Sequence, residues 1–323
     1  MTLRGKLPAG ESVGSGLNWP HYYSRPMKPL WTGVFPAVTT QFHRDQSLDL
    51  EGTLRHVETL VASGIDGLIV LGSLGENQTL DPAEKRQMLV ETVRHVAGRI
   101  PVLSGVAETS AAAACQYTRD AEALGAAGFM IMPAMVYKAD VREALTWFRK
   151  IGGSTGLPWM LYNNPVSYPV DITPELFAEL SDVENLVALK ESSGNTRRIT
   201  ELHNTVGDRY AIFTGVDDLM LESAILGIDG WVAGTGIAFP RENQRLWELA
   251  RQGAWDEARA LYRWFQPLLK LDTHVHFVQY IKLCLAETGL GSEWVREPRL
   301  PIDGAEREQV LRIIRQAIEK RPQ

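Results

Sequence analysis

Short apolar runs alternate with amphipathic segments along the chain from Trp31 to Gln252. A short apolar run bounded by turn residues indicates a buried strand, and apolar positions three or four residues apart indicate a helix. The pattern predicts eight strands: Gly33–Phe42, Gly67–Ser73, Pro101–Glu108, Gly128–Met135, Pro158–Pro165, Asn185–Ser192, Arg209–Val216 and Gly230–Gly236.

Eight helices are predicted between and after these strands: Leu50–Ala62, Pro82–Val96, Ala111–Leu124, Asp140–Lys150, Pro174–Leu180, Thr196–Val206, Asp217–Leu226 and Arg241–Gln252. Asp81 and Thr173 each place a capping oxygen before a proline at the first helical position. Helix stops are expected at glycines that can adopt a left-handed conformation: Gly64, Gly98, Gly125, Gly207, Gly227 and Gly253.

Eight strand–helix units predict an α/β fold, a (β/α)₈ TIM barrel, over residues 31–253. Residues 254–323 are predicted to form a C-terminal helical domain beside the barrel. Its expected helices are Ala254–Lys270, Val275–Thr288 and Ala305–Glu319. Residues 1–30 are rich in Gly, Pro, Ser and polar residues and lack a signal-peptide core, so we expect an extension outside the fold.

The composition limits the classes of partner. A 45% hydrophobic and 22% charged chain of 323 residues is typical of a globular protein, and no apolar run is long enough to cross a bilayer. The net charge of −6 and the lack of a Lys/Arg cluster argue against nucleic acid. Cys115 and Cys284 lie far apart without metal-ligand spacing, which indicates reduced, buried thiols in a cytoplasmic protein.

Two candidate catalytic residues stand at the ends of successive strands. Tyr162 lies in Leu161-Tyr162-Asn163-Asn164-Pro165, and Lys190 lies in Leu189-Lys190-Glu191. Barrel enzymes carry their chemistry at the carboxyl ends of the strands, so the phenol and the amine are expected to meet at one rim.

Lys190 is unusual because it directly follows the run Leu186–Leu189, which is apolar on both faces of the strand. Burial lowers the pKa of an ammonium group, and the neutral amine is a nucleophile toward carbonyl carbons. Tyr162 within hydrogen-bond reach can serve as a general acid and base. The simpler alternatives are that Lys190 ends its strand and points into solvent, and that Tyr162 is a buried tyrosine with a satisfied hydroxyl.

Two further patterns bear on ligand or metal binding. The turn Gly72-Ser73-Leu74-Gly75-Glu76 joins a strand to a helix and offers amide groups and the Ser73 hydroxyl to a carboxylate, although it can also be a plain glycine turn. His274 and His276 have no third partner on the barrel rim and are interpreted as structural, so no metal site is predicted. The sequence offers no cofactor motif.

With these residues in place, the chain resembles the dihydrodipicolinate synthase / N-acetylneuraminate lyase family of class I aldolases, from about Trp31 to the C-terminal helices. The turn Gly72–Glu76 resembles the family's GTTGE or GSTGE, and Tyr162-Asn163-Asn164-Pro165 resembles its YNxP. Lys190 follows Tyr162 by 190 − 162 = 28 residues. The combination is specific, although each part alone is not.

The resemblance implies a role for each of these residues. Lys190 would form a covalent imine with a 2-oxo acid, without a cofactor, and Tyr162 would relay protons. Ser73 and the amides of Ser73 and Leu74 would hold the substrate carboxylate, with the backbone of Gly215 and Val232 lining the pocket. Family members are commonly tetramers built as pairs of dimers, which implies a homo-oligomer.

Departures from the family pattern narrow the expected substrate. Synthases that condense pyruvate with aspartate semialdehyde carry an arginine where this chain has Ser167, which removes a charge-assisted clamp. Leu74 replaces the second threonine of the motif and removes a hydroxyl from the relay. The tyrosine pair after the fourth strand is also missing, since Met135 is followed two positions later by Tyr137.

What remains is a one-substrate enzyme for a 2-oxo acid or its cyclic imine. The segments Gly72–Asn77 and Tyr162–Tyr168 are most similar to the subgroup that deaminates 1-pyrroline-4-hydroxy-2-carboxylate in hydroxyproline catabolism. The alternatives are a 2-keto-3-deoxy sugar acid dehydratase or aldolase, then a dihydrodipicolinate synthase, then a barrel that binds 2-oxo acids without turnover.

Overall fold

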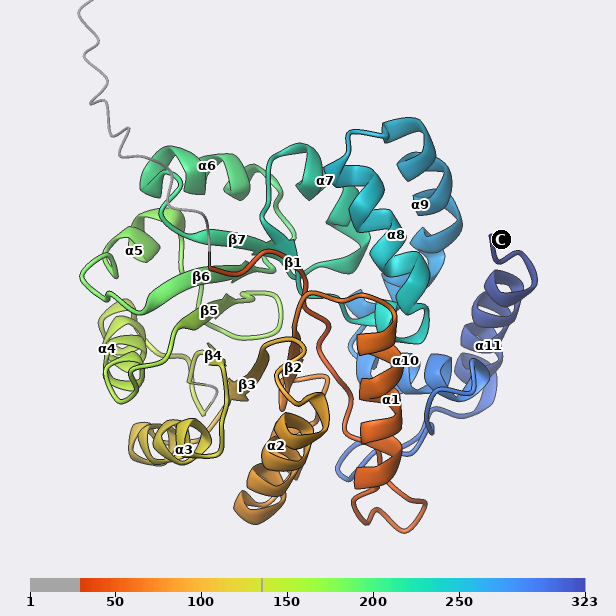
Figure 1. Cartoon of the computed structure of the whole chain (residues 1–323), viewed down its shortest axis with the longest axis horizontal. Helices are drawn as coiled ribbons and strands as arrows, with labels where there is room; N and C mark the ends of the chain where they lie inside the picture. The colour runs from red at the N-terminus through yellow and green to blue at the C-terminus, as the bar shows by residue number, and fades with distance from the viewer. Residues whose placement is uncertain (1–29, 135, 323) are drawn as a thin grey trace, which may run out of the picture.

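The computed structural model of the chain describes residues 30–134 and 136–322 (Figure 1). Residues 1–29, which make up nearly all of the expected N-terminal extension, lie outside the described residues, as does Met135.

Eight parallel strands form the centre of the molecule in the order β1-β8-β7-β6-β5-β4-β3-β2. Their bounds are Gly33–Val34 (β1), Leu68–Val70 (β2), Val102–Val106 (β3), Gly128–Ile131 (β4), Trp159–Asn163 (β5), Leu186–Glu191 (β6), Ala211–Thr214 (β7) and Gly230–Trp231 (β8). A parallel bridge between Ala37 and Ile69 joins the segment after β1 to β2 and closes the ring. The predicted (β/α)₈ barrel is therefore confirmed.

The first strand is much shorter than the predicted Gly33–Phe42 because a proline interrupts it. Pro36 has no backbone N–H to donate to a neighbouring strand. Pairing continues on either side, since Phe35 N donates to Trp231 O at 2.9 Å and Ala37 N donates to Ala233 O at 2.8 Å. The segment thus stays part of the barrel wall although little of it is a regular strand.

Helices surround the strands (Figure 1), and in the described residues one α-helix follows each strand. Their bounds are Leu50–Ala62 (α1), Pro82–Val96 (α2), Ala111–Ala123 (α3), Val141–Gly152 (α4), Pro174–Ala178 (α5), Arg197–Val206 (α6), Met220–Ile225 (α7) and Pro240–Arg251 (α8). The side chains of Asp81 and Thr173 accept backbone N–H groups at the starts of α2 and α5. All six glycines expected to stop helices have positive φ.

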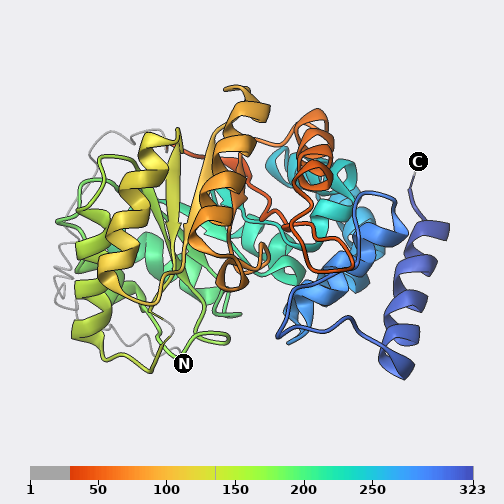
Figure 2. The same ribbon diagram turned by 90° about the horizontal axis from the view of Figure 1, so that it is seen from below.

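Three more helices follow the barrel, close to their predicted bounds: Trp255–Leu269 (α9), Phe277–Glu287 (α10) and Gly304–Glu319 (α11). They gather at one side of the molecule, with α11 farthest from the strands (Figure 2). Phe239, just before α8, packs edge-on against Trp264 and Phe265 of α9 with ring centroids 5.8 and 6.0 Å away. The apolar contact joins these helices to the barrel.

Both cysteines are buried and unpaired, as predicted. Among the helices of the described residues, none is long and apolar enough to cross a membrane.

Candidate functional site

Tyr162 and Lys190 are neighbours at the carboxyl ends of β5 and β6. Their Cα atoms are register partners in the parallel pair, so both side chains leave the same end of the barrel. The Lys190 Nζ atom lies 4.1 Å from the centroid of the Tyr162 ring. Lys190 is 8% exposed and Tyr162 is 6% exposed, so Lys190 does not point into bulk solvent.

Burial makes the charged form of Lys190 unfavourable. Removal from water lowers the pKa of the amine below the ordinary lysine value of 10.5, and electrostatic interactions with Asp272, Tyr168 and Asp217 oppose the shift. Because burial is the largest of these effects, a larger share of the amine is neutral than for a lysine in water. The neutral form is the nucleophilic one.

The Tyr162 phenol keeps its proton at neutral pH. Burial raises its pKa to about 12, and the hydrogen bond from Asn164 opposes that shift. The Asn164 Nδ2 atom donates to the Tyr162 oxygen at 3.0 Å, which leaves the phenolic O–H free to donate elsewhere. The group is therefore suited to give a proton first and to accept one afterwards.

The turn Gly72–Glu76 leads from β2 toward α2 and brings Ser73 and Leu74 to the same cavity as Lys190. The Ser73 hydroxyl forms a short hydrogen bond with the Tyr168 hydroxyl. Tyr168 also packs edge-on against Tyr162, with ring centroids 5.7 Å apart. Ser73, Tyr168 and Tyr162 thus place three hydroxyl groups in one region of the cavity.

Sequence reasoning assigned no role to Tyr168. A role could have been suspected from its position, because Tyr168 follows Tyr162 by six residues in the loop after β5. Its contact with Ser73, however, joins residues 95 positions apart and depends on how that loop folds.

Gly215 and Val232, the other predicted pocket residues, also line this cavity. A Cβ atom on Gly215 would lie 2.1 Å from Ser192 Oγ and 2.3 Å from Lys190 Cε. The position after β7 therefore has to be glycine for the lysine side chain to extend past it. Val232 is held by a hydrogen bond from its N–H to Thr214 O at 2.9 Å.

Two carboxyl groups lie near Lys190, and the sequence pattern gave neither a role: Asp217, which is fully buried, and Asp272, which is partly buried. Asp217 accepts hydrogen bonds from Trp231 Nε1 at 2.9 Å and from the Thr235 N–H at 2.7 Å, and burial raises its pKa to about 6. Asp272 comes from the segment between α9 and α10, and burial raises its pKa well above the ordinary value. The helical extension therefore contributes a residue to the cavity.

The cavity has a volume of about 840 Å³. Arg299, from the segment between α10 and α11, lines it, as does Ser167 from the loop after β5. The volume leaves room for a substrate larger than pyruvate.

His274 and His276 have a third partner that sequence reasoning did not foresee. His276 Nδ1 lies 2.7 Å from Glu306 Oε1, and ligand atoms of the three residues lie within 4.8 Å of one another. The Tyr280 hydroxyl donates to the same Glu306 oxygen at 2.5 Å. These hydrogen bonds join His276 and Tyr280 to Glu306, and the structural role of the two histidines stays a prediction.

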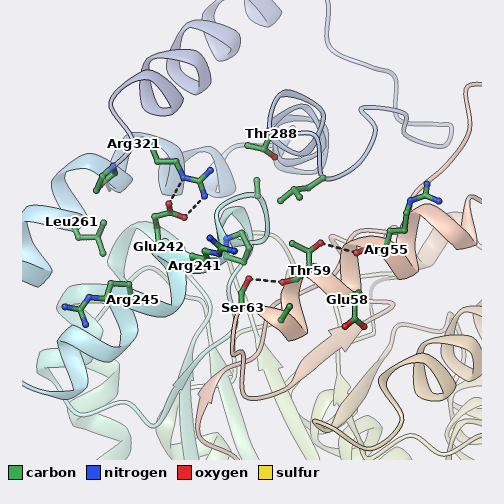
Figure 3. Close-up of a pocket in the computed structure, with 15 residues that line it drawn as sticks. Arg55, Glu58, Thr59, Ser63, Arg241, Glu242, Arg245, Leu261, Thr288 and Arg321 are labelled. Atoms are coloured by element: carbon green, nitrogen blue, oxygen red, sulfur yellow. Dashed lines mark hydrogen bonds and ion pairs between the residues drawn. The ribbon is translucent and has the colours of Figure 1, made fainter.

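A second cavity, of about 910 Å³, lies between α1, α8 and the end of the chain (Figure 3). Its charged groups include Arg241 and Arg245, and Arg321 forms a bidentate pair with Glu242. Neither Tyr162 nor Lys190 reaches it. The cavity beside β5 and β6 is therefore the candidate active site.

Residues 30–317 match the model of the dihydrodipicolinate synthetase family. The 4-hydroxy-tetrahydrodipicolinate synthase 1 of Halalkalibacterium halodurans is 30% identical over 277 residues, which cover 86% of this chain and 94% of the relative. YagE of Escherichia coli K12, whose name provisionally describes a 2-dehydro-3-deoxy-D-gluconate aldolase, is 31% identical over 302 residues, which cover 90% and 98% of the two chains.

Solved structures agree with these matches. The 4-hydroxy-tetrahydrodipicolinate synthase of Methylacidiphilum fumariolicum SolV superposes with a TM-score of 0.84 at 28% identity, covering 90% of this chain and 98% of that chain. YagE in complex with pyruvate superposes with a TM-score of 0.83 at 28% identity, covering 90% and 99%.

Proposed function

Because the chain belongs to the dihydrodipicolinate synthetase family of Schiff-base lyases and aldolases, we propose that Lys190 forms the imine with a 2-oxo acid or its cyclic imine. The observation that carries the proposal is the Lys190 amine, buried and 4.1 Å from the Tyr162 ring in a cavity of about 840 Å³. The reaction needs no metal or bound cofactor, since the lysine imine itself withdraws electrons from the substrate.

The first step is attack of the neutral Lys190 amine on C2 of the substrate. Loss of water from a carbinolamine, or opening of a ring C–N bond, then gives the protonated lysine imine. The positive charge at C2 acidifies C3, and a leaving group on C4 departs when the C3 proton is removed. Hydrolysis releases the product and returns the free amine.

Tyr162 is proposed to move the protons in these steps. Its phenol is protonated at neutral pH and can donate to the oxygen or nitrogen that leaves C2. The adjoining hydroxyls of Tyr168 and Ser73 are proposed to extend the relay within a single chain. A tyrosine from a neighbouring copy, such as Tyr137, is then unnecessary, although we retain the prediction of a homo-oligomer.

The Ser73 hydroxyl and the amides of Ser73 and Leu74 are proposed to hold the carboxylate on C2, by the attraction of backbone N–H groups for anions. Leu74 is 3% exposed and adds only apolar surface beside these groups. The backbone at Gly215 and Val232 is proposed to line the pocket near the imine carbon.

The substrate we propose first is 1-pyrroline-4-hydroxy-2-carboxylate. Lys190 attacks the ring imine carbon, the 4-hydroxyl leaves as water with a proton from Tyr162, and hydrolysis releases ammonia and 2,5-dioxopentanoate. Overall, one water is consumed and one ammonia is released. The support is the likeness of Gly72–Asn77 and Tyr162–Tyr168 to that subgroup.

A 2-keto-3-deoxy sugar acid is the second candidate, favoured by the match to YagE over 90% of this chain and by the volume of the cavity. Condensation of pyruvate with aspartate semialdehyde is less favoured. Ser167 lines the cavity where the synthases have an arginine, and a hydroxyl cannot provide the bidentate, charged contact of a guanidinium.

Borohydride trapping tests the proposed imine. The protein is incubated with pyruvate and borohydride and digested, and we expect a mass increase on the peptide that contains Lys190. Turnover is then compared for pyrroline hydroxycarboxylate, keto-deoxy sugar acids, and pyruvate with aspartate semialdehyde. Absence of an adduct would exclude the imine mechanism, whereas an adduct with turnover of only the third mixture would exclude both proposed substrates.

Removing the two phenolic hydroxyls separates their roles. Tyr162→Phe should lower kcat by about 10²- to 10⁴-fold, the usual contribution of a general acid–base group, while pyruvate still protects against thermal unfolding. Tyr168→Phe should lower kcat less, because its hydroxyl acts through Ser73 and Tyr162. A larger loss in Tyr168→Phe than in Tyr162→Phe would contradict this order; steady-state kinetics provide the comparison.

The pH dependence of imine formation should report the Lys190 amine. The rate should rise with pH as the amine loses its proton, with a midpoint below 10.5 because burial lowers the pKa. The Asp272 carboxylate stabilises the ammonium and raises that pKa, so Asp272→Asn should move the midpoint to lower pH. Initial trapping rates measured across pH give both midpoints, and an upward shift in Asp272→Asn would contradict the assignment.

A further inference from the structure

We propose that Arg299 recognises an oxygen group at the end of the substrate remote from C2, either a hydroxyl or a carboxylate. The inference rests on the proposed function, since it assumes that C2 is bound at Lys190. The segment between α10 and α11 would then contribute to substrate specificity.

The position of Arg299 fits the outer end of the cavity. Its side chain is 27% exposed, whereas Lys190 is 8% exposed, so the guanidinium lies closer to solvent than the amine does. Burial raises the pKa of the Tyr168 phenol, and both Lys190 and Arg299 counteract that rise through their charges. Tyr168 is therefore within electrostatic range of both groups, and all three residues line the same cavity.

The Arg299 guanidinium retains hydrogen-bonding capacity. Its Nη1 atom lies 3.8 Å from Glu76 Oε2, which is beyond hydrogen-bond distance. Glu76 is already paired with Lys282 Nζ at 2.6 Å and accepts the Arg296 N–H at 3.1 Å. Within the described residues, the guanidinium donates no side-chain hydrogen bond, so its five N–H donors are available to a ligand.

Arg299 is also the one guanidinium among the described residues that line the cavity. Lys190 has to be neutral to attack C2, so it cannot serve as a permanent counter-charge for the substrate. Asp218 and Asp272 line the cavity too, and burial raises the pKa of both. The fixed positive charge on the cavity wall therefore comes from Arg299.

The segment that carries Arg299 is held firmly in place. Arg296, three residues earlier, donates to both oxygens of Glu84 at 2.6 and 2.9 Å and to Gln46 O at 2.8 Å. Its guanidinium also lies over the Phe42 ring, 4.4 Å from the centroid. A fixed backbone reduces the ordering cost of the Arg299 side chain when a ligand binds.

Three five-carbon 2-oxo acids that differ only at C5 isolate the remote group. C5 is a carboxylate in 2-oxoglutarate, carries a hydroxyl in 5-hydroxy-2-oxopentanoate and is a methyl group in 2-oxopentanoate. Their dissociation constants are measured by calorimetry with the Lys190→Ala protein, so that imine formation does not contribute. A charge-assisted contact should make 2-oxoglutarate bind at least about tenfold more tightly than 2-oxopentanoate.

Arg299→Met in the same background should remove that preference, and Arg299→Lys should retain part of it. If the natural remote group is a hydroxyl, 5-hydroxy-2-oxopentanoate should bind at least as tightly as 2-oxoglutarate. Arg299→Met should then lower the affinity for the hydroxy acid to the affinity for 2-oxopentanoate. Arg315→Met is the matched control, because Arg315 is exposed and paired with Glu287. It should leave all three affinities unchanged, and thermal melts should show that every variant is folded.

Two results would overturn the proposal. One is the lack of any preference over 2-oxopentanoate in the Lys190→Ala protein, including the case in which none of the three acids binds. The other is a preference that survives in Arg299→Met. The proposed function fails by a different observation, the absence of a borohydride adduct in the wild-type protein, so the two failures can be told apart.

Discussion

The Lys190→Ala protein is expected to form no borohydride-stable adduct with pyruvate and to lose turnover by at least about 10⁴-fold, as when a covalent nucleophile is removed from an enzyme. The rest of the cavity should remain, because the backbone of β6 still pairs with β5 and β7 in the variant. Without the amine, however, the substrate cannot be converted to an imine, and the C3 proton stays too weakly acidic to remove. Intact-protein mass spectrometry and steady-state kinetics measure the two effects.

Three variants make the result specific. Lys150→Ala removes an exposed lysine of α4 and should change neither trapping nor turnover. Lys190→Arg retains a positive charge but offers no neutral nitrogen at physiological pH, so it should be as inactive as alanine. Lys282 serves as a test of the assignment, because burial lowers its pKa to about 8, although its side chain is fully buried and does not line the cavity. An adduct that persists in Lys190→Ala and disappears in Lys282→Met would assign the imine to Lys282 instead.

The fold could be read from the sequence because each barrel unit leaves a local signature. Helix α1 runs over Leu50–Ala62 and α2 over Pro82–Val96, both with the predicted bounds. Strand lengths were less predictable, since an apolar run shows burial but not how far hydrogen bonding extends. The first turn of the predicted helix Asp217–Leu226 is a 3₁₀ turn, Asp217–Leu219, in which the Asp217 side chain accepts the backbone N–H groups of Gly234 and Thr235, just after β8.

The positions of Lys190 and Tyr162 followed from the same regularity. Successive parallel strands end at one rim, so two strand-end residues 28 positions apart in sequence were expected to meet, and their Cα atoms are register partners. The turn around Ser73 was found in the same way, because it follows β2 directly.

The remaining cavity residues could not be predicted, because no strand register places them. Tyr168 depends on the path of a loop, and Asp272 and Arg299 come from segments beyond the barrel. Their approach depends on how α9, α10 and α11 pack against the barrel. That packing involves contacts across long stretches of sequence, such as Trp264 with Phe239, 25 positions apart, and Lys282 with Glu76, 206 positions apart. Periodicity carries no information about such contacts.

Breaking the buried ion pair between Glu76 and Lys282 is expected to destabilise the protein by about 3–5 kcal/mol. The two groups are 2.6 Å apart and neither is exposed at all. Lys282→Met leaves the Glu76 carboxylate in the interior without its main counter-ion and deprives Trp294 O of a hydrogen bond of 2.7 Å. Because Glu76 belongs to the Gly72–Glu76 turn, the pair also fixes α10 to the proposed carboxylate-binding residues. Urea unfolding followed by circular dichroism gives the free energy of unfolding.

The opposite variant, Glu76→Gln, should show a pH dependence that identifies the cause. Burial already lowers the pKa of Lys282 to about 8, and Glu76 counteracts this, so its removal should lower the pKa further. Between this lowered pKa and the ordinary lysine value of 10.5, the folded variant binds fewer protons than the unfolded chain. Its free energy of unfolding therefore rises with pH over that range. The destabilisation relative to wild type should therefore be smaller at alkaline than at mildly acidic pH.

In the double variant Glu76→Gln/Lys282→Met no buried charge is left unpaired, so its loss of stability should be smaller than the sum of the two single losses. Additive losses would show that packing, and not the charge pair, holds α10 to the turn.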